Sequence, residues 1–290
     1  MANLKEVRTR IASVSSTQQI TSAMKMVSAA KFRRAQNAII GMRPYAAQLN
    51  EIIADIDTGN GVQTPYHAVR PVQTAVLVVV TSNKGLCGAF NSNVLKLAQQ
   101  RIDHWRAEGA AIRVISIGKK SSELLARQKD LSLTVCDELL DSPSFDAIAT
   151  LADTLMADFA EKRIDRVELV YNQFKNSLSQ VLSDEQWLPI ENKHDRHDGK
   201  AKKNNDYIYE PSKEDILREM IPLSLRSTFY RVVLDSLAAE HGARMTAMQK
   251  ATDNATELLK DLRLSYNKAR QASITNEIIE IVSGSEALKG

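Results

Sequence analysis

The residues with the clearest capacity for chemistry lie in the stretch Asn83-Lys84-Gly85-Leu86-Cys87-Gly88, which follows an apolar run and precedes a helical pattern. A loop between a strand and a helix is where proteins often bind phosphate groups. The stretch contains neither G-x-G-x-x-G nor G-x-x-x-x-G-K-[ST], and its glycines are three positions apart. We therefore favour a tight strand-to-helix turn, and we keep an α/β nucleotide-binding enzyme as an alternative.

Other reactive side chains do not form a recognisable set. His194 and His197 fall in a charged stretch without cysteine or regular ligand spacing. Cys87 and Cys136 lie far apart and outside C-x-x-C spacing, which fits reduced thiols better than a zinc site or a disulfide framework. No combination of nucleophile, base and orienting group can be assembled. We expect no catalytic residue, no metal site and no cofactor on this chain.

The composition is that of a soluble globular protein. The chain has 290 residues, 43% of them apolar and 25% charged, which suits one large domain or two ordinary ones. No run of 18 apolar residues occurs, so we expect any membrane association to go through a partner. The first residues, MANLKEVRTRIASVSSTQ, could mimic an organelle presequence, but Glu6 interrupts their basic character and the helical pattern continues. We interpret them as the mature start.

A compact domain is expected in the middle of the chain, at residues 72–192, where strands alternate with helices. Strands are predicted at 76–80, 112–117, 131–135, 166–174 and 178–188. Helices are predicted at 91–106, from about 121, and at 145–162 with Ser144 as the N-cap. This order predicts a Rossmann-like, three-layer α/β domain with a largely parallel sheet, whose last two strands form a hairpin.

Long helical patterns occupy both ends of the chain. The first covers residues 1–58, with an apolar seam spaced three, four and three at Leu4, Val7, Ile11 and Val14. We expect the seam to continue at Ile20, Met24 and Val27, and the helix to bend near Gly41 and Pro44. The second covers residues 212–285, with an interruption at Pro222, and a charged loop at 193–211 precedes it.

Two such helices most simply fold back on each other as an antiparallel coiled coil. Matching their ends predicts that facing residue numbers sum to about 270, so that Asn3 lies opposite Asn267. Small residues are frequent on both helices, and alanines recur every four positions at 239, 243, 247, 251 and 255, which allows close approach. The tail from residue 268 to 283 would continue as a single helix.

That tail and the N-terminal charge both indicate a protein partner. Apolar residues of the tail point in several directions, so the helix needs surroundings on several sides. From Met1 to Arg43 there are eight lysines or arginines and only one acidic residue, Glu6. Nucleic acid is the alternative partner, but Phe32 is the only aromatic in that run, which gives no platform for stacking bases, and the net charge is only +3. We do not expect nucleic-acid binding.

Three stretches together resemble the gamma subunit of the rotary, F-type ATP synthase. They are IASVSSTQQITSAMKMVSAAKFRRAQ near the N-terminus, TSNKGLCGAFN after the first strand, and ARMTAMQKATDNATELLKDLRLSYNKARQASITNEIIEIVSGSEAL at the C-terminus. The resemblance covers nearly the whole chain. It implies a non-catalytic rotor whose paired helices turn inside a hexamer of alpha and beta subunits, driven by proton flow through a membrane c-ring.

The resemblance also implies partners and contact residues. Arg244, Arg270, Gln271, Thr275 and Met24 match positions that meet the beta subunits. Tyr207 and Glu210 match the motif at the foot of the rotor, where it touches the c-ring or the epsilon subunit. ATP, ADP and Mg would be bound by the partner subunits and not by this chain.

The implied location is peripheral, on the cytoplasmic face of the bacterial plasma membrane. The middle domain lacks the long insertion with a cysteine pair found in photosynthetic members of the family, so we expect no such redox switch. Two alternatives remain from the residues alone: the nucleotide-binding enzyme named above, with helical oligomerisation arms, and a static coiled-coil adaptor.

Overall fold

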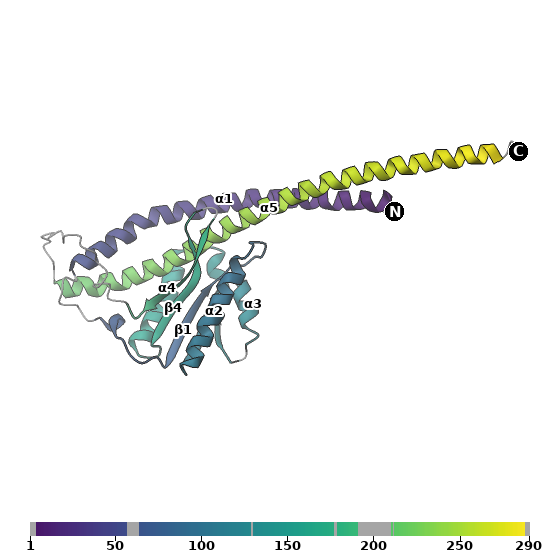
Figure 1. Ribbon diagram of the computed structural model, residues 1–290. Coiled ribbons are helices and arrows are strands. Elements are labelled where there is room, and N and C mark those ends of the chain that lie inside the picture. Colours follow the sequence, from purple (N-terminus) through teal and green to yellow (C-terminus); the bar gives the residue numbers. More distant parts are fainter. Residues whose placement is uncertain are drawn as a thin grey trace, which may run out of the picture. The chain divides into compact units, whose positions relative to one another are not determined.

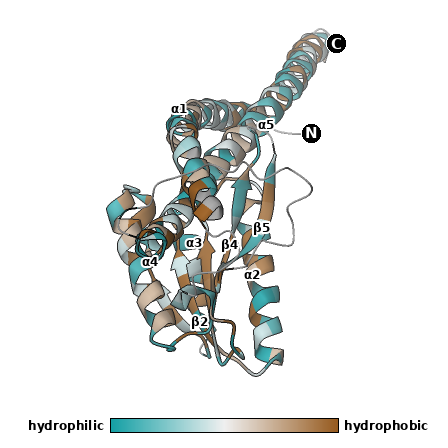
Figure 2. Cartoon of the chain, turned by 90° about the vertical axis from the view of Figure 1, so that its left-hand side faces the viewer, coloured by the Kyte–Doolittle hydropathy of each residue, from teal (hydrophilic) through white to brown (hydrophobic). Residues whose placement is uncertain are grey.

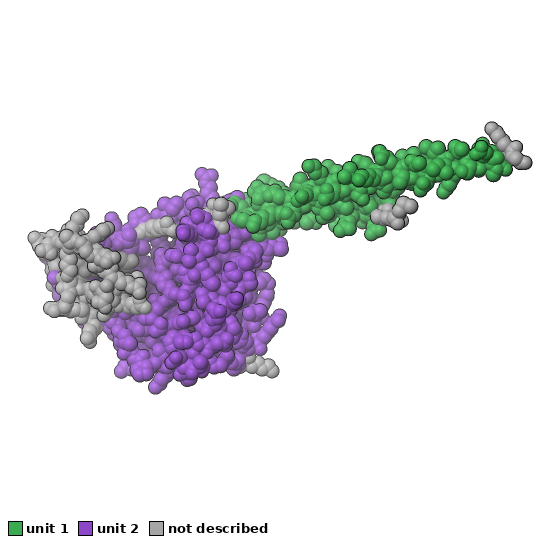
Figure 3. Space-filling view, in the orientation of Figure 1, with its two compact units in different colours: residues 1–28, 245–290 green, residues 29–244 purple. Residues whose placement is uncertain are grey.

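The computed structural model describes residues 4–56, 64–128, 130–176, 179–190, 210 and 212–287 (Figure 1). The chain divides into two compact units (Figure 3). Unit 1 consists of residues 1–28 and 245–290, and unit 2 consists of residues 29–244. Both long terminal helices are therefore shared between the units, a division that the sequence does not suggest. The predicted loop at 193–211 lies outside the described residues, except for Glu210.

The two terminal helices are continuous. Helix α1 spans Leu4–Ile56 and includes Pro44, and helix α5 spans Lys213–Ala287 and includes Pro222. The expected interruption at Pro222 is therefore wrong. A proline inside a helix costs about 3 kcal/mol, and the packing on both sides of it offsets that cost. On the two sides of Pro222, the side chains of Leu217, Ile221 and Leu225 are all buried in the core of unit 2.

Unit 2 contains a five-stranded sheet in the order β3-β2-β1-β4-β5. Its strands are β1 (Thr74–Val80), β2 (Ala111–Ile117), β3 (Ser132–Val135), β4 (Arg166–Phe174) and β5 (Gln180–Leu188). The first four are parallel, and β5 pairs antiparallel with β4. In the register, Val78 of the central strand pairs with Ile115 on one side and Leu169 on the other. The predicted parallel sheet with a final hairpin is confirmed.

Helices cover both faces of this sheet. They are α2 (Phe90–Ala107), α3 (Lys119–Leu125) and α4 (Phe145–Ala160), with 3-10 turns at Pro65–His67 and Asp137–Leu140. Ser144 caps α4, and its side chain accepts a hydrogen bond from the Ala147 amide, as predicted. Each covering helix needs one apolar face, and α2 shows a brown side and a teal side in Figure 2.

The side chains of the strands alternate between two hydrophobic cores. Leu77 and Val79 point to the face covered by α2 and α3, where they meet Val94 and Ile102. The opposite face packs on α4 and α5, and its largest fully buried side chains are Phe159, Phe229 and Tyr171. Since β1 is buried on both faces, its unbroken apolar sequence is explained. The predicted three-layer α/β architecture is confirmed.

Two buried carboxylates form hydrogen bonds at the end of the sheet where β4 begins. Asp165 accepts hydrogen bonds from the Arg70 guanidinium at 2.6 Å and from the backbone N–H groups of Gln73 and Thr74, both at 2.9 Å. Burial alone would raise the pKa of Asp165, but these donors outweigh it and lower the pKa. The second carboxylate, Glu168, lies among Arg101, Arg166 and Trp105 and has a lowered pKa for the same reason.

Candidate interaction surfaces

Unit 1 is a pair of helical segments from the two ends of the chain, and a heptad seam joins them. The inward positions of α1 recur at intervals of four and three and comprise Val7, Ile11, Val14, Gln18, Thr21, Lys25 and Ser28. Those of α5 recur in the same way and comprise Met245, Met248, Thr252, Ala255, Leu259, Leu262 and Tyr266. A repeat of 3.5 residues keeps two helices in contact along their length. The predicted coiled-coil pairing is therefore present.

Polar side chains cross this seam and define its register. The Thr252 and Thr21 hydroxyl oxygens are 2.8 Å apart, and Gln18 donates to Thr256 at 2.7 Å. Arg8 donates to the Tyr266 hydroxyl at 2.8 Å, near the end of the pair. Facing residue numbers therefore sum to 273 or 274. The predicted sum of about 270 is too small by about one helical turn, because it came from matching helix ends only.

The expected continuation of the seam at Ile20, Met24 and Val27 is wrong. Ile20 and Val27 are 57% and 58% exposed. The heptad repeat instead continues without a shift of phase through polar and small residues. Met24, a predicted beta-subunit contact, is half-buried, and its carbonyl accepts a hydrogen bond from the Ser28 hydroxyl at 2.7 Å. In this part of α1, Ile20 and Val27 therefore face outward.

The end of α5 extends beyond the paired region as a single, exposed helix. Arg270, Gln271 and Thr275, three further predicted beta-subunit contacts, all lie on its exposed surface. Thr275 donates its hydroxyl hydrogen to the Gln271 carbonyl, so its side chain is bonded to its own helix. The predicted contact of these residues with a beta subunit stays a prediction.

Large apolar side chains are also exposed on this part of α5. They are Ile274, Ile278, Ile279, Ile281 and Val282, with exposed fractions from 49% to 71%. At about 100° per residue, Ile274, Ile278 and Ile281 form one stripe, and Ile279 lies roughly 140° around the helix from Ile274. Figure 2 shows brown and teal residues interleaved on this segment. Such a surface is expected of a helix that a partner surrounds.

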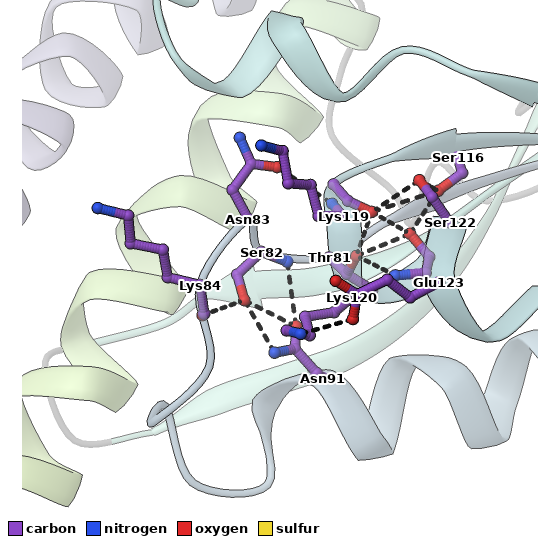
Figure 4. A network of polar contacts seen from close by, with 12 residues as sticks. Thr81, Ser82, Asn83, Lys84, Asn91, Ser116, Lys119, Lys120, Ser122 and Glu123 are labelled. Atoms are coloured by element: carbon purple, nitrogen blue, oxygen red, sulfur yellow. Dashed lines mark hydrogen bonds and ion pairs between the residues drawn. The ribbon is translucent and has the colours of Figure 1, made fainter.

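In unit 2, the turn between β1 and α2 is stabilised by its own side chains. Asn91 accepts a hydrogen bond from the Ser82 amide at 3.0 Å, and the Ser82 hydroxyl donates to the Lys84 carbonyl at 2.8 Å (Figure 4). The residues Leu86 and Gly88 both have positive φ, which bends the chain sharply. The favoured interpretation of this stretch as a tight turn agrees with the structure. These polar groups bond to one another and form no phosphate-binding motif.

Arg244 lies against this turn. Its guanidinium donates to the Gly85 carbonyl at 3.2 Å, to the Lys84 carbonyl at 2.5 Å and to the Glu240 carboxylate at 2.6 Å. Arg244 was predicted as a beta-subunit contact, and that contact stays a prediction. Its partner Glu240 was not singled out from the sequence. The signal available there was the spacing of four between an acid and a base on one helix.

Four residues considered from the sequence fall in the charged loop at 193–211. Tyr207, His194 and His197 lie outside the described residues, and Glu210 is exposed. Within the ranges that the structure describes, no group of three or more His, Cys, Asp or Glu side chains could hold a metal ion. In those same ranges, no helix combines the length and the apolar character needed to cross a membrane.

Comparisons with known proteins agree on one family. The family model described as ATP synthase matches residues 3–288. The ATP synthase gamma chain of Flavobacterium johnsoniae is 51% identical over 292 residues, which cover all of both chains. That of Christiangramia forsetii is 48% identical over 293 residues, again over the full length of both.

Solved structures with the same fold come from rotary assemblies. A chain of the Tetrahymena thermophila mitochondrial ATP synthase central stalk and c-ring matches with a TM-score of 0.60 and 26% identity, over 80% of this chain and 99% of that one. A chain of the Euglena gracilis mitochondrial ATP synthase, in a structure of its OSCP, F1 and c-ring, matches with a TM-score of 0.71. It is 22% identical and covers 98% of this chain and 94% of that one, which supports the fold.

Proposed function

The chain belongs to the ATP synthase gamma chain family, and from that premise we propose that it is the central-stalk rotor subunit of an F-type ATP synthase. It couples proton flow through a membrane c-ring to ATP synthesis or hydrolysis on the beta subunits by turning inside the hexamer of alpha and beta subunits. The chain itself is non-catalytic.

The observation that carries this proposal is the exposed apolar end of α5. Leaving isoleucines exposed to water on more than one side of a helix is unfavourable, and burying each of them would contribute about 1.5–3 kcal/mol of stabilisation. A ring of subunits with a central hole supplies apolar surroundings on all sides. A static adaptor would need a single apolar stripe, because it contacts its partner on one side only.

Partners and location follow from this role. The alpha and beta subunits surround unit 1, and the epsilon subunit and the c-ring contact the chain elsewhere. ATP, ADP and Mg bind to the partner subunits, and this chain carries no cofactor. The complex is membrane-associated, and we place this chain on the cytoplasmic face of the bacterial plasma membrane, where it is held by its partners.

The contact residues are assigned by their match to the family. Arg270, Gln271 and Thr275 are exposed on the end of α5 and would contact the beta subunits, as would the half-buried Met24. Tyr207 and Glu210 would contact the c-ring or the epsilon subunit. Arg244 matches a shaft arginine of the family, and its contact with a beta subunit stays a prediction.

Reconstitution with alpha and beta subunits of the same source tests the proposal. The intact chain is expected to enter the hexamer as a single copy and to support cooperative ATP hydrolysis. Truncation after Asn267, or the double change Ile278→Gln and Ile281→Gln, should weaken its retention in the complex. Val69→Gln is a matched control, since Val69 is an 85% exposed apolar residue of unit 2.

Two results would contradict the proposal. One is a hexamer that never takes up the chain, or that takes up the tail variants as well as the intact chain. The other is hydrolysis of ATP by the isolated chain, which would favour the nucleotide-binding enzyme. Retention is measured by gel filtration of the complex, and turnover by phosphate release.

A further inference from the structure

Glu240 and Arg244 form a buried ion pair on α5. Their side chains are only 9% and 8% exposed, and the Arg244 Nη1 atom is 2.6 Å from the Glu240 Oε1 atom. The other nitrogens of the guanidinium donate to two backbone carbonyls of the turn after β1, those of Lys84 and Gly85. One side chain therefore connects α5 to the sheet of unit 2.

The turn offers these carbonyls in a fixed direction. The Asn91 side chain donates to Ser82 at 2.8 Å (Figure 4). It also donates to the Cys87 sulfur at 3.2 Å, so the start of α2 is tied to the turn. Asn83 accepts a hydrogen bond from the Lys119 amide at 3.1 Å, which ties the turn to the loop after β2. Arg244 is thus held to a rigid part of the sheet, not to a free loop.

The ion pair between Glu240 and Arg244 is not expected to stabilise the fold. Burial raises the pKa of Glu240, and the charges of Arg244 and Lys31 do not cancel that effect. His241 also lies beside the pair, with its Nδ1 atom 3.4 Å from the Arg244 Nη1 atom. A buried pair whose carboxylate is harder to ionise than in water costs more desolvation than its attraction returns. Such a pair is expected to position the elements that it contacts, and not to stabilise the fold.

We propose that Glu240 and Arg244 form a clamp that fixes the rotational setting of α5 against the turn at residues 84–85, so that a twist applied to α5 reaches the sheet of unit 2. Arg244 is the last residue of unit 2 on α5. Both are positioning residues: Arg244 holds the turn, and Glu240 holds the guanidinium in place. The part of this inference that concerns torque rests on the proposed function.

A role for Arg244 as a surface contact makes a different prediction. Its guanidinium already has three acceptors inside unit 2 and is almost fully buried. If Arg244 served a partner subunit only, changes at Glu240 would have no effect on the turn. Variants of Glu240 therefore separate the two roles without altering the arginine.

The first experiment needs only the full chain. Hydrogen exchange of the amides at residues 82–88 is measured in the wild type, in Glu240→Met with Arg244→Met, in Glu240→Met and in Glu240→Gln. We expect amide exchange about tenfold or more faster in both variants that carry Glu240→Met. In the double variant the contacts of Arg244 with the turn are lost, and in the single variant the guanidinium is left without its carboxylate partner. Glu240→Gln keeps an acceptor for Arg244 and should resemble the wild type. Asp103→Met with Arg106→Met removes an exposed pair of α2 and should change nothing at the turn.

Thermal unfolding separates positioning from stabilisation. The double methionine variant should unfold at the same temperature as the wild type or higher, since it replaces a costly ion pair by apolar side chains of similar length. A clear fall in its midpoint, or unchanged exchange at residues 82–88, would overturn the clamp. These readouts do not depend on assembly, so they stand even if the proposed function fails.

The second experiment uses the whole synthase in vesicles. The ratio of ATP-driven proton pumping to ATP hydrolysis should fall in the double methionine variant and in Glu240→Met, and Glu240→Gln should keep it near the wild-type value. An unchanged ratio in Glu240→Met, with faster exchange at the turn, would overturn the role in torque while leaving the rotor assignment intact.

Discussion

Thr252 of α5 places its hydroxyl oxygen 2.8 Å from that of Thr21 on α1, in the middle of the helical pair of unit 1. A hydrogen-bonded pair of hydroxyls in the seam favours one register over its neighbours, because a slip would separate the two hydroxyls and place them opposite apolar side chains. The two threonines thus define how α1 and α5 pair in unit 1.

This register can be tested with a disulfide. In a background in which Cys87 and Cys136 are replaced by serine, Thr21→Cys with Thr252→Cys should form a disulfide readily under mild oxidation, since the two side chains already meet. The product is measured as a mobility shift on a non-reducing gel.

A second cysteine pair serves as the control. Thr21→Cys with Gln249→Cys matches the register expected from the helix ends alone and should cross-link poorly. Preferential cross-linking of that pair would contradict the observed seam.

Asp165 is expected to be among the residues on which stability depends most. Replacing it with alanine leaves Arg70 and two backbone N–H groups without their acceptor, which should cost about 3 kcal/mol. Asp103→Ala, at an exposed ion pair of α2, should cost less than about 0.5 kcal/mol. Urea unfolding followed by tryptophan fluorescence measures both.

Low pH should remove the contribution of Asp165 to stability. Because the folded-state pKa of Asp165 is below the usual 3.8, its contribution is present above that value and is lost as the pH falls through the lower, folded-state pKa. The difference in stability between wild type and Asp165→Ala should therefore shrink only below about pH 4. A difference that shrinks near neutral pH would point to another group.

Gly118 is expected to tolerate no side chain. Its φ is +119°, and a Cβ atom there would lie 2.7 Å from the Thr81 carbonyl oxygen. Gly118→Ala should therefore destabilise unit 2 by roughly 3 kcal/mol. Two glycines with open space around them are controls. Gly109→Ala, at a φ of +78°, should cost about 1 kcal/mol, and Gly41→Ala inside α1 should stabilise by up to about 1 kcal/mol. The midpoints of thermal unfolding should follow that order.

His241 should make stability depend on pH below neutrality. Burial lowers its pKa from 6.5 to about 4, and the charges of Arg244 and Lys31 act in the same direction. The unfolded chain therefore takes up a proton that the folded chain does not, and stability falls as the pH drops from 6.5 towards 4.

His241→Gln isolates this effect. The variant keeps a hydrogen-bonding side chain near Arg244, and it should lose less stability than the wild type between pH 6.5 and 4.5. Glu240 has a raised pKa and acts in the opposite direction, but it is present in both proteins, so the difference curve reports His241. A titration of the His241 ring near pH 6.5 by NMR would contradict the prediction.

Much of unit 2 could be predicted from the sequence, because its elements follow simple patterns. The apolar run of β1 and the cap at Ser144 come from local chemistry, and the structure places both within two residues of their expected positions. Local patterns also indicate the hairpin of β4 and β5. The family, and with it the function, came from longer motifs and not from periodicity.

What could not be predicted depends on contacts between distant residues. The seam of unit 1 continues through Gln18 and Thr21, which no apolar pattern marks, and outward-facing Ile20 drew the expected seam to the wrong side. Pro222 lies inside a helix only because tertiary packing holds both flanks. The role of Glu240 depends on Arg244, whose guanidinium meets the distant turn after β1 only in the folded chain.

The exposed isoleucines at the end of α5 also have a consequence for the cell. A copy of this chain that has not yet found its hexamer displays the kind of apolar surface that chaperones and proteases recognise. Assembly hides that surface. Unassembled copies should therefore be degraded faster than assembled ones. The amount of this chain in the cell would then match the amount of its partner subunits.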